Sequence, residues 1–157
     1  MTADSGDELA LLPRLAQLGT AMNRGRLAQQ ATEATGLALD RPAMTILLTL
    51  AMAGSPLRVG EIADRMQVVG PHVTRQVQAL EHRGLVRRVT DPNDRRASLI
   101  EPTDTGAEAA NRYTSTVADW FRTAIANWSP EDRTELNRLL TKLTDDLTTS
   151  LTQDDTH

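Results

Sequence analysis

The sequence predicts a mainly α-helical protein that carries one small β-hairpin. Two observations lead to this fold class. First, apolar residues recur at intervals of three and four over much of the 157 residues, which is the spacing of amphipathic helices. Second, two segments rich in aliphatic residues, 85–90 and 97–101, flank the turn sequence Asp91-Pro92-Asn93-Asp94, which is typical of a hairpin.

The composition excludes several classes of site. The chain has no cysteine, which rules out disulfides, thiolate zinc sites and thiol-based redox switches. The three histidines, His72, His82 and His157, are scattered, so we expect no metal and no cofactor. No apolar run approaches the roughly 18 residues that cross a bilayer, and the first residues are acidic and polar, unlike a signal peptide. We therefore expect a cytoplasmic protein without a membrane partner.

The first part of the chain is expected to form helices that support the rest. Residues 1–7 read as a disordered tail, and residues 8–55 as N-terminal helices for dimerisation and support. The first helix carries an apolar stripe that needs a partner: Leu11, Leu15, Leu18 and Met22. Gly36 is a plausible stop. Asp40 then caps a second helix that has Pro42 in its first turn, where the missing N–H costs little.

Residues 56–102 form a small unit of two helices and the hairpin. A short strand is possible at 57–59, followed by a helix over 60–66 and a brief link. A second helix runs from Pro71 to about Arg83, and Gly84 follows where a left-handed residue commonly ends a helix. This order is that of a winged helix-turn-helix, with the hairpin as the wing.

The second helix of this unit has a face suited to DNA. At 100° per residue, Val73, Val77 and Leu80 form its buried stripe. The opposite face and its flanks carry mostly polar side chains: Pro71, His72, Thr74, Arg75, Gln78, Ala79 and His82. Arginine can pair with guanine and glutamine with adenine in the major groove, and a small alanine allows close approach.

The charge distribution agrees with this interpretation. The formal net charge is −4, which is unusual for a DNA-binding protein. Eight arginines against five carboxylates give residues 58–96 a charge of +3, which leaves −7 for the rest. One basic segment in an acidic protein concentrates the attraction for phosphate on one face.

Arg95 and Arg96 follow the turn at the tip of the predicted wing. An arginine there can enter a narrow minor groove, where the potential is most negative. We expect Asp94 to hold the neighbouring guanidinium in an extended pose.

Residues 103–151 are expected to form C-terminal dimerisation helices, followed by a tail at 152–157. Thr103 caps a helix to about Asn127, and Ser129 caps the last one. The last helix carries a leucine seam that needs a partner: Leu136, Leu140, Leu143, Leu147 and Leu151. Tyr113 and Trp120 share a helix face, for which core packing is favoured over an effector pocket.

Together these residues resemble one family. The similarity runs from Leu57 to Gly106 and extends to the helical layout on both sides. Its segments are Glu61-Ile62-Ala63, Val73-Thr74-Arg75, Leu80-Glu81-His82-Arg83-Gly84-Leu85-Val86-Arg87-Arg88, Asp91-Pro92-Asn93-Asp94-Arg95-Arg96 and Thr103-Asp104-Thr105-Gly106. The combined pattern is highly specific, and it resembles the MarR family of bacterial repressors.

The resemblance implies a homodimer with interlocked terminal helices that binds double-stranded DNA. It implies a sequence-specific transcriptional regulator, a repressor on a (pseudo)palindromic operator, released by an unidentified small-molecule effector. Thr74 and Arg75 would contact base edges or phosphates, and Arg95, or else Arg96, would enter the minor groove. The full set of expected DNA contacts is Pro71, His72, Thr74, Arg75, Gln78, His82, Arg95 and Arg96.

Three features depart from the family pattern. Pro71-His72 stands where small hydroxyl residues are usual, Ala43 replaces a common glutamine, and the lack of cysteine excludes peroxide sensing. Two other functions agree less well with these residues. A winged helix that only binds protein is disfavoured by Arg75, Gln78, Arg95 and Arg96. An enzyme is disfavoured because no nucleophile–base pair, phosphate loop or metal-ligand cluster is evident.

Overall fold

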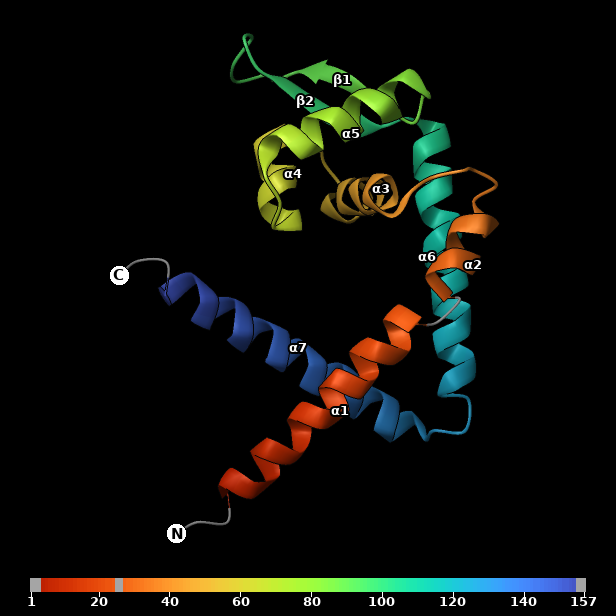
Figure 1. The fold of residues 1–157 in the computed structure, drawn as a ribbon, viewed down its shortest axis with the longest axis vertical. Coiled ribbons are helices and arrows are strands. Elements are labelled where there is room, and N and C mark those ends of the chain that lie inside the picture. The colour runs from red at the N-terminus through yellow and green to blue at the C-terminus, as the bar shows by residue number, and fades with distance from the viewer. Residues whose placement is uncertain (1–3, 25–26, 155–157) are drawn as a thin grey trace. The chain divides into compact units, whose positions relative to one another are not determined.

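The computed structural model describes residues 4–24 and 27–154, and it divides into two compact units at Ala118 and Asp119. Within these residues the protein has seven helices and one two-stranded antiparallel hairpin (Figure 1). The predicted mainly α fold class with a small β wing is therefore confirmed. None of the described helices is long and apolar enough to cross a membrane.

The N-terminal segment holds two helices where the sequence predicted one from Glu8. Helix α1 spans Asp4–Arg24 and α2 spans Leu27–Ala34. Helix α1 thus begins four residues earlier than expected, inside the segment predicted as a tail. Its leucines remain 46–61% exposed: Leu11, Leu12, Leu15 and Leu18. The side chain of Met22 lies outside the described residues.

Helix α3, Arg41–Ala53, is the centre of the first unit. The Ala43 N–H donates to Asp40 Oδ1 at 2.9 Å, so the predicted cap is present, and Gly54 ends the helix at φ 65°. Ile46, Leu47 and Leu50 are at most 1% exposed. A helix buried around much of its circumference provides the surface on which the neighbouring elements pack.

Helices α4, Val59–Met66, and α5, Gly70–His82, pack on α3 and on each other. The three-residue link between them begins at Gln67, whose φ of 54° is left-handed. Ile62, Val73 and Val77 have no exposed surface, and Leu80 has 1%. The apolar stripe of the second helix is therefore where the sequence predicted it, and its orientation fixes which face of α5 meets solvent.

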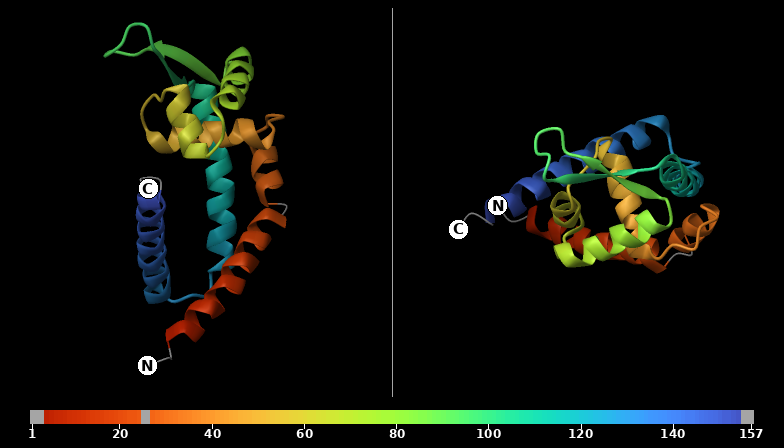
Figure 2. Two further views of the ribbon diagram at one scale, coloured as in Figure 1. Left: turned by 60° about the vertical axis from the view of Figure 1, so that its left-hand side comes forward. Right: turned by 90° about the horizontal axis from the view of Figure 1, so that it is seen from above.

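The hairpin consists of β1, Val86–Thr90, and β2, Ser98–Pro102, in a register that pairs Arg88 with Ile100. The expected strand at 57–59 is reduced to a single bridge. Leu57 exchanges both backbone hydrogen bonds with Ile100, at 3.0 and 2.8 Å. This bridge anchors the middle of β2, where Ile100 is fully buried, while the loop at 91–97 projects from the unit (Figure 2).

Helix α6, Asp104–Ala124, begins against the end of α5. Thr103 Oγ1 donates to the Gly84 carbonyl at 2.7 Å and accepts the Gly106 N–H at 3.2 Å, so the predicted cap is present. A Cβ at Gly106 would lie 1.9 Å from the Leu85 carbonyl oxygen. Glycine is required there because backbone meets backbone. The helix ends three residues before the expected Asn127.

The second unit contains the end of α6 and helix α7, Pro130–Asp154. Ser129 Oγ accepts the Asp132 N–H at 3.0 Å, which confirms the expected cap. The helix extends three residues into the segment predicted as a tail. Its leucines are 39–54% exposed: Leu139, Leu140, Leu143 and Leu147. The side chain of Leu151 lies outside the described residues.

Candidate nucleic-acid interface

The solvent face of α5 carries most of the predicted DNA contacts. Opposite the buried stripe, one row of side chains is exposed: Pro71, Thr74, Arg75, Gln78, Ala79 and His82. His72 is half-buried on the flank. Because the helix is held by Val73, Val77 and Leu80 with almost no exposed surface, this row has a fixed orientation. The face has the composition and rigidity that a major-groove reading helix needs.

Arg75 and Gln78 keep their hydrogen-bonding groups available. Neither side chain has a hydrogen bond or ion pair with any residue that the structure describes. Both can therefore pair with base edges without first breaking an internal contact. Thr74 differs, because its Oγ1 already donates to the Gly70 carbonyl at 3.1 Å. Its hydroxyl is left as an acceptor, for example of a base amino group or a water molecule.

The loop of the hairpin is organised by two aspartates. Asp91 Oδ1 accepts the Asn93 N–H at 2.8 Å, and Asp94 Oδ1 accepts the Arg96 N–H at 3.0 Å. The expectation that Asp94 holds a neighbouring guanidinium is wrong, since its carboxylate binds backbone and shapes the turn. The guanidinium groups of Arg95 and Arg96 are exposed and have no partner in the described chain, which leaves them available for phosphate or groove contacts.

Arg58 connects the wing to the start of α4. Its Nε and Nη2 both donate to Asp91 Oδ2, at 3.1 and 2.6 Å, and the Asp91 side chain is only 7% exposed. The Arg58 N–H also donates to Glu61 Oε2 at 2.6 Å. The hydrogen bonds from Arg58 hold the pKa of Asp91 below its usual range. The partners are 33 positions apart, so no local pattern in the sequence indicated this contact.

The basic segment is partly neutralised by internal pairs. Arg87 pairs with Glu101 at 2.6 Å, and Arg88 pairs with Glu81 at 3.1 Å. Arg83 Nη1 instead donates to the Ala38 carbonyl at 2.7 Å. With Arg58 bound to Asp91, four of the eight arginines have internal partners. The other four have none within the described chain: Arg65, Arg75, Arg95 and Arg96. Arg65 is one of the basic residues of segment 58–96, but it is not among the DNA contacts expected from the sequence.

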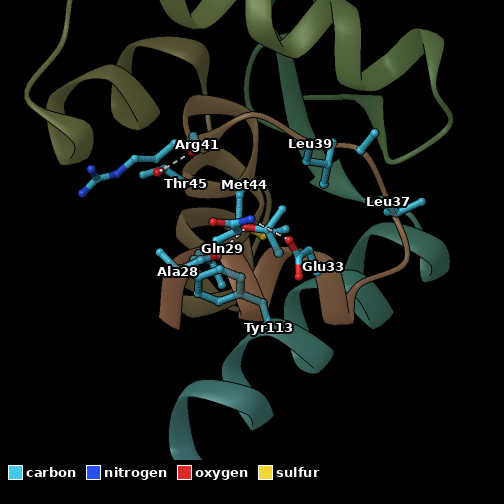
Figure 3. A pocket seen from close by; sticks show the side chains of 12 residues that line it. Ala28, Gln29, Glu33, Leu37, Leu39, Arg41, Met44, Thr45 and Tyr113 are labelled. Carbon is cyan, nitrogen blue, oxygen red and sulfur yellow. Dashed lines mark hydrogen bonds between the residues drawn. The ribbon is translucent and has the colours of Figure 1, made fainter. Parts of the chain in front are cut away.

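A cavity of about 540 Å³ lies between α2, α3 and α6 (Figure 3). Tyr113 lines it and is half-buried against the core, so this residue both packs on the core and contributes to the wall of a pocket. Trp120 does not line this cavity and is 41% exposed. Among the residues described, no three histidine or carboxylate side chains gather as a metal site would require.

Comparisons with known proteins agree with this geometry. Residues 39–98 match the model of the MarR family. The uncharacterised HTH-type transcriptional regulator YxaD of Bacillus subtilis is 28% identical over 127 residues, which is 81% of this chain and 87% of that protein.

Two solved structures have the same fold. A MarR family protein from Bacillus stearothermophilus superposes with a TM-score of 0.71 at 23% identity, over 94% of this chain and 99% of that one. MepR of S. aureus bound to ethidium bromide gives a TM-score of 0.60 at 24% identity, over 88% and 94% of the chains.

Proposed function

The chain belongs to the MarR family, and from this premise we propose that it is a sequence-specific repressor that binds a (pseudo)palindromic operator as a homodimer. Like these relatives, it is a DNA-binding transcription regulator and not an enzyme. The observation that carries the proposal is the exposed row on α5, in which Arg75 and Gln78 have no internal partner, beside a wing whose arginines are also available.

We assign residues 56–102 to DNA binding. Helix α5 would lie in the major groove, with Arg75 and Gln78 at base edges and Pro71, His72, Thr74 and His82 around them. Arg95, or Arg96 in its place, would reach the adjacent minor groove from the wing. This assignment agrees with the internal pairing of Arg87 and Arg88, which leaves the unpaired arginines on α4, α5 and the wing tip.

The segments 8–55 and 103–151 would form the dimer. Apolar side chains on α1 and α7 are 39–61% exposed in the single chain. Exposed rows of this length are typical of surfaces that another chain covers. A second copy buries both rows and sets two α5 helices about one turn of DNA apart, roughly 34–36 Å. The negative charge of the remaining chain discourages DNA from wrapping around it.

Release by a small molecule is the remaining part of the proposal. The cavity lies between α2, the central helix α3, and α6, which belongs to the proposed dimerisation segment. A ligand that holds these elements apart shifts the spacing of the two recognition helices and so lowers affinity for DNA. The binding of ethidium by MepR, a protein of the same fold, supports a ligand site in this fold.

The decisive experiment is protection mapping on the DNA upstream of the chain's own gene, at two salt concentrations. We expect two protected half-sites related by approximate symmetry, one helical turn apart, and an affinity that falls steeply with salt. Protection of a single asymmetric patch would contradict the dimeric arrangement. An affinity for duplex DNA that is absent even at low ionic strength would contradict the function itself.

A further inference from the structure

The cavity between α2, α3 and α6 has apolar walls and one carboxylate at its side. Its walls are formed largely by Leu37, Leu39, Met44, Leu48 and Tyr113. Met44 is 2% exposed, so the floor is part of the core. A volume of about 540 Å³ is in the range of sites for drug-sized ligands. The polar side chains of the lining therefore determine which ligands of this size can bind.

Glu33 is the carboxylate of this cavity. Gln29 Nε2 donates to Glu33 Oε1 at 2.8 Å, and no other side chain in the described chain donates to this carboxylate. The amide orients the carboxylate but does not neutralise it, because it carries no charge. Figure 3 shows the Gln29–Glu33 pair and the ring of Tyr113 lining the same space.

The other lining groups do not compensate this charge. Arg41 also lines the cavity, but Figure 3 shows its guanidinium extending away from Glu33 and Tyr113, and the two charges form no ion pair. Two of the three hydroxyl groups in the lining are used internally, and the third is that of Tyr113. Thr32 Oγ1 donates to the Ala28 carbonyl at 2.8 Å, and Thr45 Oγ1 donates to the Arg41 carbonyl at 2.9 Å. The cavity thus offers a ligand the negative charge of Glu33, and the Tyr113 hydroxyl is the one hydroxyl of its lining with no acceptor among the described residues.

We infer that this cavity binds an aromatic monocation, with the positive group at Glu33 and the ring against Tyr113 and Met44. An aromatic face attracts a cation, and a methionine sulfur makes favourable contacts with aromatic rings. Glu33 is exposed, so its carboxylate supplies the opposite charge where the ligand need not be fully desolvated. The inference rests on the proposed function, because it names the chemical class of the effector.

The test compares two ligands of similar shape and opposite charge, 2-naphthyltrimethylammonium and naphthalene-2-sulfonate, by titration calorimetry on the purified protein without DNA. We expect the cation to bind about tenfold more tightly than the anion, which corresponds to one well-placed charge. Glu33→Gln keeps the shape and the contact with Gln29, and it should lower cation affinity by about fivefold or more while leaving the anion unchanged.

Glu108→Gln is the matched control. Glu108 pairs with Arg112 on the exposed side of α6 and does not line the cavity, so the same change of charge should leave both affinities unchanged. Equal or tighter binding of the anion, no binding of either ligand, or an unchanged cation affinity in Glu33→Gln would each overturn the inference.

A parallel titration of the DNA complex separates this inference from the proposed function. Cation binding that depends on Glu33 but leaves DNA affinity unchanged supports the ligand class and contradicts its role as an effector. Failure of the protein to bind DNA would contradict the proposed function, while the calorimetric result would still decide the ligand class.

Discussion

The guanidinium of Arg58 clamps Asp91 with two hydrogen bonds, at 3.1 and 2.6 Å, and so joins the start of α4 to the first residue after β1. Asp91 Oδ1 also accepts the Asn93 N–H, which begins the loop that carries Arg95 and Arg96. One carboxylate therefore connects the helix-turn-helix to the tip of the wing. The direction in which the wing projects depends on this contact.

Asp91→Asn should weaken DNA binding although residue 91 touches no DNA in the proposed complex. The amide is uncharged and has only one oxygen, so it cannot bind both the Arg58 guanidinium and the Asn93 N–H as the carboxylate does. The wing loop then samples more conformations, and its arginines lose more conformational entropy on binding. Fluorescence anisotropy on the operator measures the affinity, and amide hydrogen exchange at 91–97 reports the loop. If amide exchange at 91–97 becomes faster but the affinity for the operator is unchanged, the order of the wing loop does not contribute to DNA binding, and the prediction is wrong.

The same contact predicts a dependence of stability on acid. The hydrogen bonds from Arg58 and the Asn93 N–H lower the pKa of Asp91 from its ordinary value of 3.8. A carboxyl with a lowered folded pKa stabilises the fold fully above the unfolded pKa and loses this contribution as the pH falls through the folded pKa. The urea midpoints of the wild type and Asp91→Asn should differ by a constant amount down to pH 3.8 and converge below it. A difference between the two urea midpoints that stays constant at every pH would show that ionisation of Asp91 does not stabilise the fold.

Much of this architecture follows from local sequence. The stripe Val73, Val77 and Leu80 needs only helical periodicity, and the hairpin needs only a turn sequence between two aliphatic segments. The clamp between Arg58 and Asp91 could not be predicted, because it joins positions brought together by the packing of α4 against the wing. The role of Asp94 also depends on more than its neighbours in the sequence. The sequence predicts a guanidinium partner because Arg95 is adjacent, but it does not reveal that the turn needs the carboxylate to accept the Arg96 N–H.

Arg75→Ala should abolish specific DNA binding and leave the fold intact. Arg75 is exposed and has no partner in the described chain, so its removal leaves no buried group unsatisfied. Loss of one bidentate base contact costs about 1–3 kcal/mol, and each protomer of a dimer loses one. Arg122→Ala removes the same charge from the exposed pair with Asp119 and should change DNA affinity little. Electrophoretic mobility shifts and circular dichroism measure binding and folding.

Arg95→Ala and Arg96→Ala identify the wing contact. Both guanidinium groups are exposed on the same loop, but only one is expected to enter the minor groove. That variant should lose about 1–3 kcal/mol, and the loss should shrink when the wing site is changed from A·T to G·C pairs, which widen the groove. The other should show only the weaker, sequence-independent effect of a phosphate contact. Equal losses on every sequence would indicate that neither arginine reads the groove.

Gly106→Ala should destabilise the protein, although the replacement of glycine by alanine in a helix usually stabilises it. The added Cβ would lie 1.9 Å from the Leu85 carbonyl oxygen, and Leu47 Cδ2 lies 3.3 Å away on the core side. Since Leu85 also accepts the Thr103 N–H through this carbonyl, α6 must move away from the end of α5, at a cost of about 1–3 kcal/mol.

Gly60→Ala in α4 is the control, because nothing lies within 4 Å of its Cβ position. There alanine should stabilise the fold by about 0.4–1 kcal/mol, since it restricts the unfolded chain. Urea denaturation of both variants measures the difference, and an equal effect of the two substitutions would mean that the backbone contact between Gly106 and Leu85 does not limit the packing of α6.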